Sequence, residues 1–424
     1  MKILALQFKY FGDAVLMTPA LRALRAHFPE AEIHLLAPEE IAPLFQHLPW
    51  LDRVWAMPRR RGRASLRETW PLIRALRRER FDRTVDFASN DRGAILSRLI
   101  GAKNRLGWNE RAGFWGRRFC YNCRVEPNTS SEPDNAGLPA FHEPGRWNDE
   151  APHPGPLPIL TPHPCQNAER ETRSQRLAEG GRVHGPNVHP NLEAGASHVR
   201  DSGTGAGPVR PETHRQDACA TIEHESARLA RLLCGWQIPM PASLEPEIRA
   251  APALAEAAKK LLPQDHAVVC HVASSQPRKE WPLPHWAEFH RLATALGRQL
   301  VFTTARGERE TGLMLELKKL APAASILPAI PDLPLFLAVL ERAAVFISGD
   351  TGPLHFAAGL GVPTISIFGP TAPARWAPVG AKHVVLAAAH CGCDGSSADC
   401  TAARHCLADL SPESVLAALA ERGR

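Results

Sequence analysis

The chain has 424 residues, of which 44% are hydrophobic and 22% are charged, so it is long enough for two domains and typical of a globular protein. Its net charge of +6 is diffuse and no aromatic-and-basic binding motif is present, so we expect no nucleic-acid partner. There is no run of 18 apolar residues, no signal-peptide core is evident, and ten cysteines favour reduced thiols, so we expect a cytoplasmic protein.

The first 126 residues alternate apolar strands with helices. Apolar residues recur with helical spacing from Asp13 to Phe28, and further helices are predicted at about 65–80 and 91–99. The expected strands lie at residues 2–8, 32–37, 53–57, 81–88 and 102–108. This alternation predicts parallel βαβ units with right-handed crossovers.

Residues 127–221 differ in composition from the chain on either side. They are crowded with Pro, Gly, His, Asn and Arg and are poor in Ile, Val, Phe and Leu. Such a segment cannot bury enough apolar surface to offset its conformational entropy, so we predict a disordered insertion. Its histidines could form a metal-binding loop with Cys165 or Cys219, but their spacing matches no zinc pattern.

The strand–helix alternation resumes after the insertion. A helix is predicted at 224–233, and strands are expected at 267–271, 299–303, 324–327, 345–348, 364–368 and 384–386. The chain therefore divides into an N-terminal α/β domain at 1–126, the insertion at 127–221, and a C-terminal α/β domain at 222–424.

A Gly-Asp pair follows the first strand. Gly12 lets the backbone turn, and Asp13 begins a helix at the carboxyl edge of the sheet, where ligands of open α/β sheets bind. A carboxylate there could accept a proton from an acceptor hydroxyl, or it could only cap the helix. The dinucleotide fingerprint G-x-G-x-x-G does not follow this strand.

The stretch 345–371 is the most informative of the chain. It reads as a buried strand, a Gly-Asp-Thr-Gly turn, a short helix and a second buried strand. Backbone N–H groups at a helix N-terminus suit phosphate, so we expect a diphosphate-bearing ligand. The residues expected to share this rim are Asp350, Thr351, Gly352 and His355. The alternative is an ordinary strand–helix turn capped by Asp350.

Two other strand ends carry polar residues. After the strand at 267–271, Ser274 and Ser275 offer hydroxyl groups and Lys279 offers a cation that could neutralise a leaving diphosphate, unless this is only a solvated loop. After the strand at 299–303, Glu308, or failing that Glu310, could accept the ribose hydroxyls of a nucleotide. The alternative for each glutamate is an acidic residue favoured at a helix start.

For two further features an ordinary structural explanation is at least as well supported by the sequence as a functional one. The basic helix around Arg74–Arg80 could meet an anionic lipid or a phosphorylated acceptor, or could be a plain solvated face. The cysteines at 391, 393, 400 and 406 could hold zinc, but the one-residue spacing of the first pair favours buried or loosely paired thiols.

Together these motifs resemble the heptosyltransferase-like glycosyltransferase family 9. The resemblance covers about 1–126 and 222–424. It rests on Gly12-Asp13 with Thr18-Pro-Ala-Leu21, Phe81-Asp-Arg-Thr-Val-Asp86, Arg105-Leu-Gly-Trp108, Ser274-Ser275 with Lys279-Glu-Trp-Pro282, Asp350-Thr-Gly-Pro-Leu-His355, Phe368-Gly-Pro-Thr371, and the cysteines with Leu410-Ser-Pro-Glu413. The 127–221 block has no counterpart in the family pattern.

The resemblance implies a GT-B fold: two Rossmann-like domains facing a cleft, with the acceptor on the N-terminal side and the nucleotide sugar on the C-terminal side. Asp13 is similar to the family's proposed general base, and Lys279 resembles the lysine beside the donor phosphates. The residues that match donor contacts are Ser274, Ser275, Asp350, Thr351, Gly352 and His355, with Glu308 and Glu310 as alternatives for the ribose.

The resemblance also implies a reaction: inverting transfer of a heptose or related sugar from an ADP-sugar to a lipopolysaccharide or lipid-linked glycan acceptor. No bound metal is required, although Mg²⁺ could assist at the diphosphate. Such a protein could touch the anionic inner face of the inner membrane. The alternatives are a GT-B enzyme that uses another nucleotide sugar, a nucleotide-sugar epimerase or hydrolase, and a non-catalytic nucleotide-sugar or glycan-binding protein.

Overall fold

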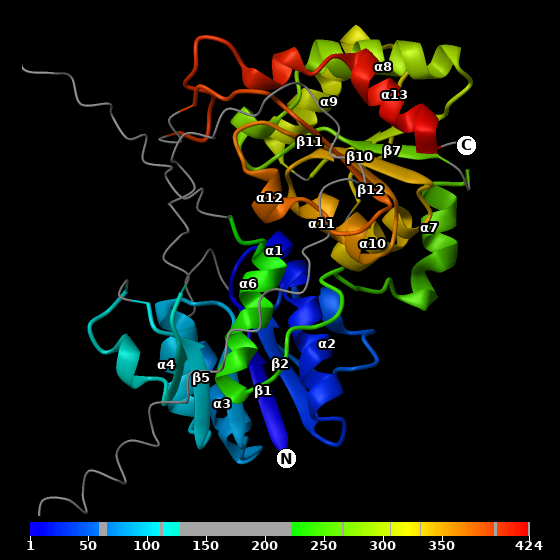
Figure 1. The fold of residues 1–424 in the computed structure, drawn as a ribbon. Coiled ribbons are helices and arrows are strands. Elements are labelled where there is room, and N and C mark those ends of the chain that lie inside the picture. The colour runs from blue at the N-terminus through cyan, green and yellow to red at the C-terminus, as the bar shows by residue number, and fades with distance from the viewer. Residues whose placement is uncertain are drawn as a thin grey trace, which may run out of the picture. The chain divides into compact units, whose positions relative to one another are not determined.

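Two six-stranded parallel sheets form the framework of the protein (Figure 1). The computed structural model describes residues 1–58, 66–110, 113–127, 222–264, 267–305, 307–330, 332–393 and 397–422, without the side chains of 66–68. Both sheets lie in one compact unit of the chain. The predicted insertion lies outside the described residues from residue 128 onward.

The first sheet contains β1 (Lys2–Leu6), β2 (Glu32–Pro38), β3 (Arg53–Met57), β4 (Arg83–Asp86), β5 (Asn104–Trp108) and β6 (Cys123–Val125). Its helices are α1 (Phe11–Leu16), α2 (Thr18–His27), α3 (Leu66–Arg78) and α4 (Asp91–Ile100). The strand order is β3-β2-β1-β4-β5-β6, and every neighbouring pair is parallel. This is the doubly wound order of a Rossmann-like sheet.

The second sheet contains β7 (Val268–His271), β8 (Leu300–Thr303), β9 (Ser325–Ile326), β10 (Val345–Gly349), β11 (Thr364–Phe368) and β12 (His383–Ala387). The helices of this half are α7 (Ala255–Leu261), α8 (Leu283–Ala295), α9 (Glu308–Leu320), α10 (Leu333–Glu341), α11 (Gly352–Gly359), α12 (Pro373–Trp376) and α13 (Pro412–Arg422). The order β9-β8-β7-β10-β11-β12 repeats that of the first sheet, again with parallel pairs.

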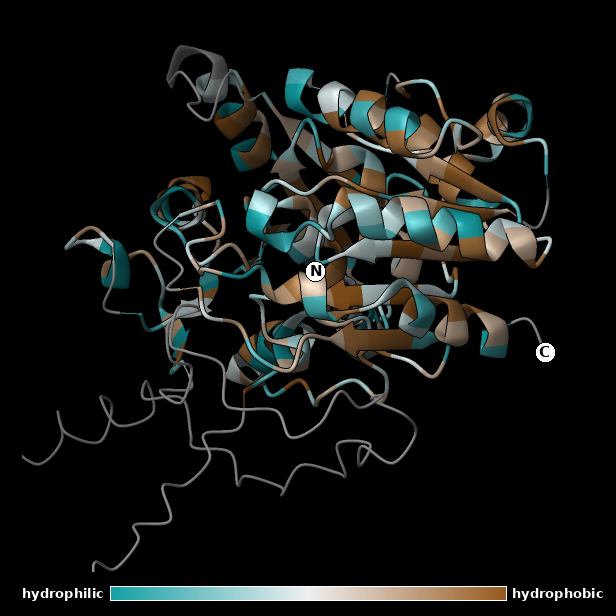
Figure 2. Ribbon diagram, turned by 90° about the horizontal axis from the view of Figure 1, so that it is seen from above, coloured by the Kyte–Doolittle hydropathy of each residue, from teal (hydrophilic) through white to brown (hydrophobic). Residues whose placement is uncertain are grey.

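The strands are apolar along their length because helices cover both faces of each sheet. In the first strand, Ile3 to Leu6 have no exposed surface. Figure 2 shows the strands mainly in the brown of hydrophobic residues, whereas the helices carry both colours. The prediction of an α/β fold with two Rossmann-like sheets is confirmed.

Two details differ from the expected elements. The single helix expected from Asp13 to Phe28 is two helices, because the chain breaks at Met17 and restarts with Pro19 in the first turn of α2. Proline is favoured there because an N–H group in the first turn of a helix has no acceptor within the helix, so the lack of this group in proline costs no hydrogen bond. The short strand β6 (Cys123–Val125) was not predicted, because three residues carry too little periodicity to detect.

The segment that follows residue 222 packs first on the N-terminal sheet. Helix α6 (Glu225–Arg231) continues into a 3₁₀ turn, η3 (Leu232–Trp236). Trp236 Nε1 donates to Asn104 Oδ1 at 2.7 Å, and Cys123 Sγ donates to Gly235 O at 3.0 Å. Residues 232–236 therefore contact β5 and β6, while the predicted domain limits at 126 and 222 stay predictions.

One arginine of α6 contacts described residues on both sides of the segment 128–221. Arg231 Nη1 donates to the backbone oxygen of Glu126 at 3.0 Å. Its Nε lies 2.9 Å from Glu223 Oε1 and its Nη2 lies 3.1 Å from Glu223 Oε2. The described residues before and after the segment are thus fixed to the same side chain.

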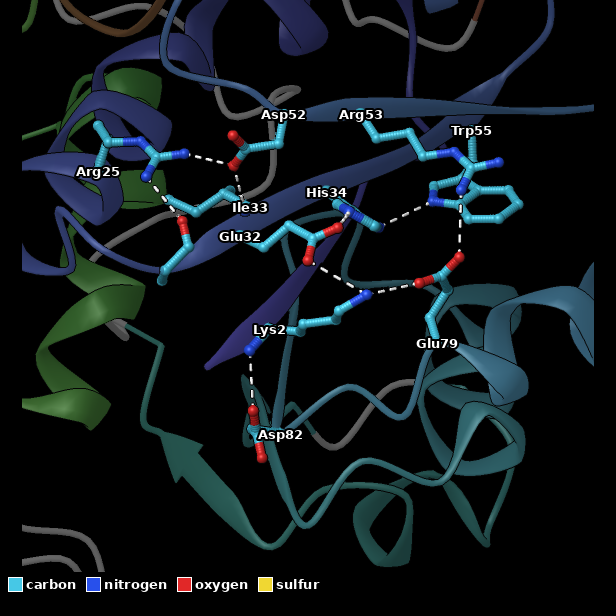
Figure 3. A network of polar contacts seen from close by, with 11 residues as sticks. Lys2, Arg25, Glu32, Ile33, His34, Asp52, Arg53, Trp55, Glu79 and Asp82 are labelled. Atoms are coloured by element: carbon cyan, nitrogen blue, oxygen red, sulfur yellow. Dashed lines mark hydrogen bonds and ion pairs between the residues drawn. The ribbon is translucent and has the colours of Figure 1, made fainter.

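A polar network joins the amino ends of the strands in the first sheet (Figure 3). Lys2 Nζ lies 3.1 Å from Glu32 Oε2 and 2.7 Å from Glu79 Oε2. Trp55 Nε1 donates to His34 Nδ1 at 3.1 Å, so the proton of this ring lies on Nε2, which donates to Glu32 at 2.8 Å. This network ties the amino edge together and leaves the opposite, carboxyl edge for ligands.

Candidate active site

The predicted site residues follow the central strands of the two sheets. In an open α/β sheet, ligands bind at the carboxyl ends of the strands where the strand order reverses. That point lies between β1 and β4 in the first sheet and between β7 and β10 in the second. Asp13 follows β1, Ser274 and Lys279 follow β7, and Asp350 follows β10.

Lys279 and Asp350 form a buried ion pair. Lys279 Nζ donates to Asp350 Oδ2 at 2.7 Å, and the two side chains are 18% and 9% exposed. Burial alone would raise the pKa of Asp350, but the Lys279 ammonium holds it below its usual value. Asp350 is therefore ionised at neutral pH, and it positions the lysine rather than capping α11.

The Lys279 loop approaches β10 at backbone level. A Cβ atom on Gly349 would lie 2.7 Å from the backbone oxygen of Lys279. Only a residue without a side chain allows this contact. Gly349 thereby fixes the distance between the two loops that supply the ion pair.

His355 lies behind the ion pair as a neutral ring. Its Nε2 is 3.9 Å from Asp350 Oδ1, and its side chain is 4% exposed. Burial lowers the pKa of His355 to about 4, although the Asp350 carboxylate acts in the opposite direction. The buried Nδ1 has no hydrogen-bond partner among the described residues. His355 can therefore exchange hydrogen bonds with a ligand but brings no full positive charge at neutral pH.

Thr351 and Gly352 form the start of α11. Thr351 is the N-cap residue, and within the described structure its side chain makes no capping hydrogen bond. Both residues are partly exposed. Pro353 has no N–H, and the Leu354 N–H donates to the backbone oxygen of Thr351 at 3.1 Å. The groups at this end of the helix that can serve a ligand are thus the Thr351 hydroxyl and the Gly352 N–H.

Helix α1 packs directly on α11. A Cβ on Gly12 would lie 2.8 Å from His355 Cδ2, so the glycine allows the histidine ring to lie against α1. The rings of Phe11 and Phe356 meet edge to face with centroids 5.8 Å apart. This contact brings the predicted base side and the predicted donor side of the site together.

Asp13 lies in the first turn of α1 but is not its cap. The N-cap residue is Tyr10, and the Asp13 side chain is 13% exposed. Burial raises the pKa of Asp13, while Lys9, whose Nζ lies 3.8 Å from Oδ1, lowers it. A largely buried carboxylate with a raised pKa is a stronger base than an exposed one, which suits proton abstraction.

The serine loop is held by a pair that the sequence analysis missed. Arg309 Nη1 lies 2.9 and 3.0 Å from the two carboxylate oxygens of Glu280, and Arg309 Nη2 donates to the backbone oxygen of Ser274. Glu280 Oε1 also accepts the Ser274 N–H at 2.7 Å. Ser274 is buried by these contacts, whereas Ser275 is exposed and can reach a ligand.

Glu308 and Glu310 both lie in the first turn of α9. Glu308 is exposed, and Glu310 Oε1 lies 3.2 Å from Arg309 Nη2. This geometry is that of helix-start acids, and it leaves Glu308 with the less encumbered carboxylate. Their role as ribose contacts stays a prediction.

The cysteine segment at the C-terminal side backs the Lys279 loop. Cys391 and Cys406 are buried, Cys393 and Cys400 are partly exposed, and all four are free thiols. The Sγ atoms of Cys393 and Cys400 lie 3.4 Å apart. The backbone oxygen of Ala398 accepts the N–H of Arg278 at 3.0 Å. The segment therefore touches the loop next to the predicted phosphate-binding lysine.

A second missed residue is Glu225, at the start of α6. It has no exposed surface and lies within 3.6 Å of cationic atoms on Lys9, Arg228 and Arg375. The sequence signal is only a glutamate three residues before an arginine, which usually marks a solvated helix face. Its burial depends on elements far away in the chain, so local pattern could not find it.

Among the described residues, no helix is long and apolar enough to cross a membrane. The arginine-rich residues 59–63, which precede the predicted basic helix in the sequence, lie outside the described residues. Arg77 Nη1, on the basic helix α3, donates to the backbone oxygen of Leu99 at 2.8 Å. The proposed lipid contact of this helix stays a prediction.

Comparison with known proteins supports the resemblance. Residues 216–403 match the family model of glycosyltransferase family 9 (heptosyltransferase). Lipopolysaccharide heptosyltransferase 2 of Escherichia coli K12 is 30% identical over 108 residues, which are 26% of this chain and 31% of that protein. The alignments span only 31% to 35% of the length of the first curated relatives.

Solved structures share the fold over nearly the whole chain. The E. coli ADP-heptose lipopolysaccharide heptosyltransferase II matches with a TM-score of 0.63 and 16% identity, covering 100% of this chain and 98% of that chain. The E. coli heptosyltransferase WaaC, solved with ADP, matches with a TM-score of 0.60 and 17% identity, covering 100% of both chains. These likenesses identify the GT-B fold. The chain therefore carries a glycosyltransferase family 9 (heptosyltransferase) domain over residues 216–403.

Proposed function

We propose that the protein is an inverting glycosyltransferase that moves a heptose from an ADP-sugar to an acceptor of the lipopolysaccharide type. The observation that carries this proposal is the contact between α1 and α11. It puts the helix of a desolvated carboxylate, Asp13, against the helix whose first turn adjoins the Lys279–Asp350 pair. A base and a cationic leaving-group site on adjoining elements are what direct displacement at a sugar carbon requires.

In this reaction Asp13 accepts the proton of the acceptor hydroxyl while the oxygen of that hydroxyl forms a bond to the anomeric carbon. The bond from that carbon to the donor phosphate breaks, and its electron pair stays on the departing nucleoside diphosphate. Because the attack comes from the face opposite the leaving group, the anomeric configuration inverts. Asp13 suits the first part because burial raises its pKa.

The departing diphosphate would lie at the start of α11. Lys279 supplies the positive charge, and the hydroxyl groups of Ser275 and Thr351 and the N–H of Gly352 supply hydrogen-bond donors. His355 is neutral at neutral pH, so it would add a hydrogen bond rather than charge. Mg²⁺ could assist at the diphosphate, while Lys279 and these hydrogen-bond donors allow the reaction without a bound metal.

The ADP donor is supported by the match to a heptosyltransferase family and by the fold shared with a protein solved with ADP. Glu308, at the start of α9, is the side chain we assign to the ribose hydroxyls. The acceptor would approach from the first sheet, on the side of Asp13 and Gly12. The basic helix α3 could then meet the anionic lipid surface that carries such an acceptor.

Calorimetric titration with ADP-, UDP- and GDP-sugars tests the donor. We expect selective binding of the ADP-sugar, weakened at least tenfold in Lys279→Ala and unchanged in Lys259→Ala, an exposed lysine on α7. Transfer to a lipopolysaccharide-type acceptor, followed by mass spectrometry, tests the reaction. A preference for UDP or GDP would move the protein to another substrate class, and binding without turnover would make it a nucleotide-sugar-binding protein.

A further inference from the structure

Glu225 is the centre of a buried charge cluster beside the proposed base. Its carboxylate receives Arg228 in a two-pronged contact, with Nε 2.9 Å from Oε2 and Nη2 2.7 Å from Oε1. Lys9 Nζ lies 3.6 Å from Oε1, and Arg375 Nη2 lies 3.5 Å from Oε2. A fully buried carboxylate with three cationic partners is held in one geometry.

The three partners come from different parts of the fold. Lys9 precedes α1, Arg228 lies on α6, and Arg375 lies on α12 in the C-terminal half. Next to Glu225, His224 Nε2 lies 2.9 Å from the backbone oxygen of Ala377, which directly follows α12. The start of α6 therefore ties α12 to the segment that leads into α1.

Asp13 and Glu225 share Lys9. Lys9 Nζ lies 3.8 Å from Asp13 Oδ1 and 3.6 Å from Glu225 Oε1, so neither carboxylate has the ammonium to itself. Arg228 also acts on Asp13 through space. Without the negative charge of Glu225, the positive charges of Lys9 and Arg228 would stabilise the ionised form of Asp13 and lower its pKa. A carboxylate paired with cations in this way is a weak base.

We propose that Glu225 is a positioning residue for the general base, which engages Lys9, Arg228 and Arg375 and so keeps these cations from neutralising Asp13. The catalytic role of Glu225 in this inference rests on the proposed function, but the charge coupling between Glu225 and Asp13 exists whether or not transfer occurs. The coupling can therefore be measured without a substrate.

The charged and titratable groups that face Asp13 can be named element by element. Lys9 comes from the segment after β1, and Glu225 and Arg228 come from α6. His355, on α11, lies against Gly12 and is neutral because burial lowers its pKa to about 4. Replacing Glu225 by glutamine removes the one negative charge in this set that opposes ionisation of Asp13. The pKa of Asp13 must then fall.

The test is the titration of the Asp13 carboxyl carbon in protein labelled with ¹³C at the aspartate side chain. The resonance is assigned as the one that disappears in Asp13→Asn. In Glu225→Gln we expect its midpoint to fall by on the order of one pH unit, the size of shift that a nearby buried charge produces. Glu223→Gln is the matched control, because Glu223 pairs with Arg231 and should leave the midpoint unchanged.

A second variant separates the expected effect from a general folding defect, because it should shift the Asp13 midpoint in the opposite direction. Lys9→Gln removes a cation from the other side of the same set, so the Asp13 midpoint should rise rather than fall. If the transfer reaction is present, the acid limb of the kcat profile should shift in the same direction as each midpoint. Absence of transfer in the wild type would refute the proposed function and leave the titrations to decide this inference. An Asp13 midpoint that stays constant in Glu225→Gln or in Lys9→Gln would overturn it.

Discussion

Replacing Lys279 by alanine should destabilise the folded protein at neutral pH. The substitution leaves the Asp350 carboxylate, 9% exposed, without the ammonium that lies 2.7 Å away. Removing one partner of a buried pair costs about 3–5 kcal/mol, and since Lys279 itself is 18% exposed we expect about 2–3 kcal/mol here. Urea unfolding at pH 7.5 measures this loss, with Lys259→Ala as the control for removing an exposed lysine.

The loss of unfolding free energy in Lys279→Ala should be smaller in acid, and the direction of this pH dependence follows from the pKa of Asp350. In the wild type its folded pKa lies below the unfolded value, so its contribution is present at neutral pH and lost only as the pH falls through the folded pKa. Without Lys279, burial dominates and the pKa of Asp350 rises above the unfolded value, so protonation relieves the unpaired charge. At pH 5 the gap between variant and wild type should therefore narrow, and adding Asp350→Asn should narrow it at pH 7.5. A gap that is equal at both pH values would refute this reasoning.

Three further outcomes are expected. Asp13→Asn should lower turnover by about 10²–10⁴-fold while calorimetry shows unchanged donor binding, and a variant that keeps its turnover would exclude Asp13 as the base. Gly12→Ala should cost about 1–3 kcal/mol in urea unfolding, because the new Cβ would lie 2.8 Å from the buried His355 ring, whereas Gly312→Ala, which faces open space on α9, should not destabilise. Deletion of 128–221 should leave folding and turnover largely intact, and loss of soluble expression would contradict this.

The fold could be predicted because its signal is local and repeated. Short buried strands alternate with helices through both halves, and parallel pairing with right-handed crossovers leaves few topologies. The elements that differed are those where the pattern is weak: the break at Met17 and the three-residue strand β6.

The site could be predicted only where it follows strand ends in order. Asp350 directly follows β10, while Asp13 and Lys279 lie in the connections that follow β1 and β7, and parallel strands bring such positions to one edge. Glu225 could not be found this way, because it follows residues 128–221 and two of its three cationic partners, Lys9 and Arg375, come from distant segments. Arg309 was missed because its contact with the Ser274 backbone joins the start of α9 to the separate loop after β7.

The attachment of residues 126 and 223 to one arginine gives the chain a natural place to be split. Arg231 fixes the distance between the two ends, so the length of the connection does not change the geometry of either sheet. Each doubling of a flexible connection costs only about 0.6 kcal/mol of loop entropy, so this position can absorb added sequence cheaply. It is also where a nick, a fused reporter or two separately expressed fragments should leave Asp13 and Lys279 in their relative positions, since η3 already packs the second fragment onto the first.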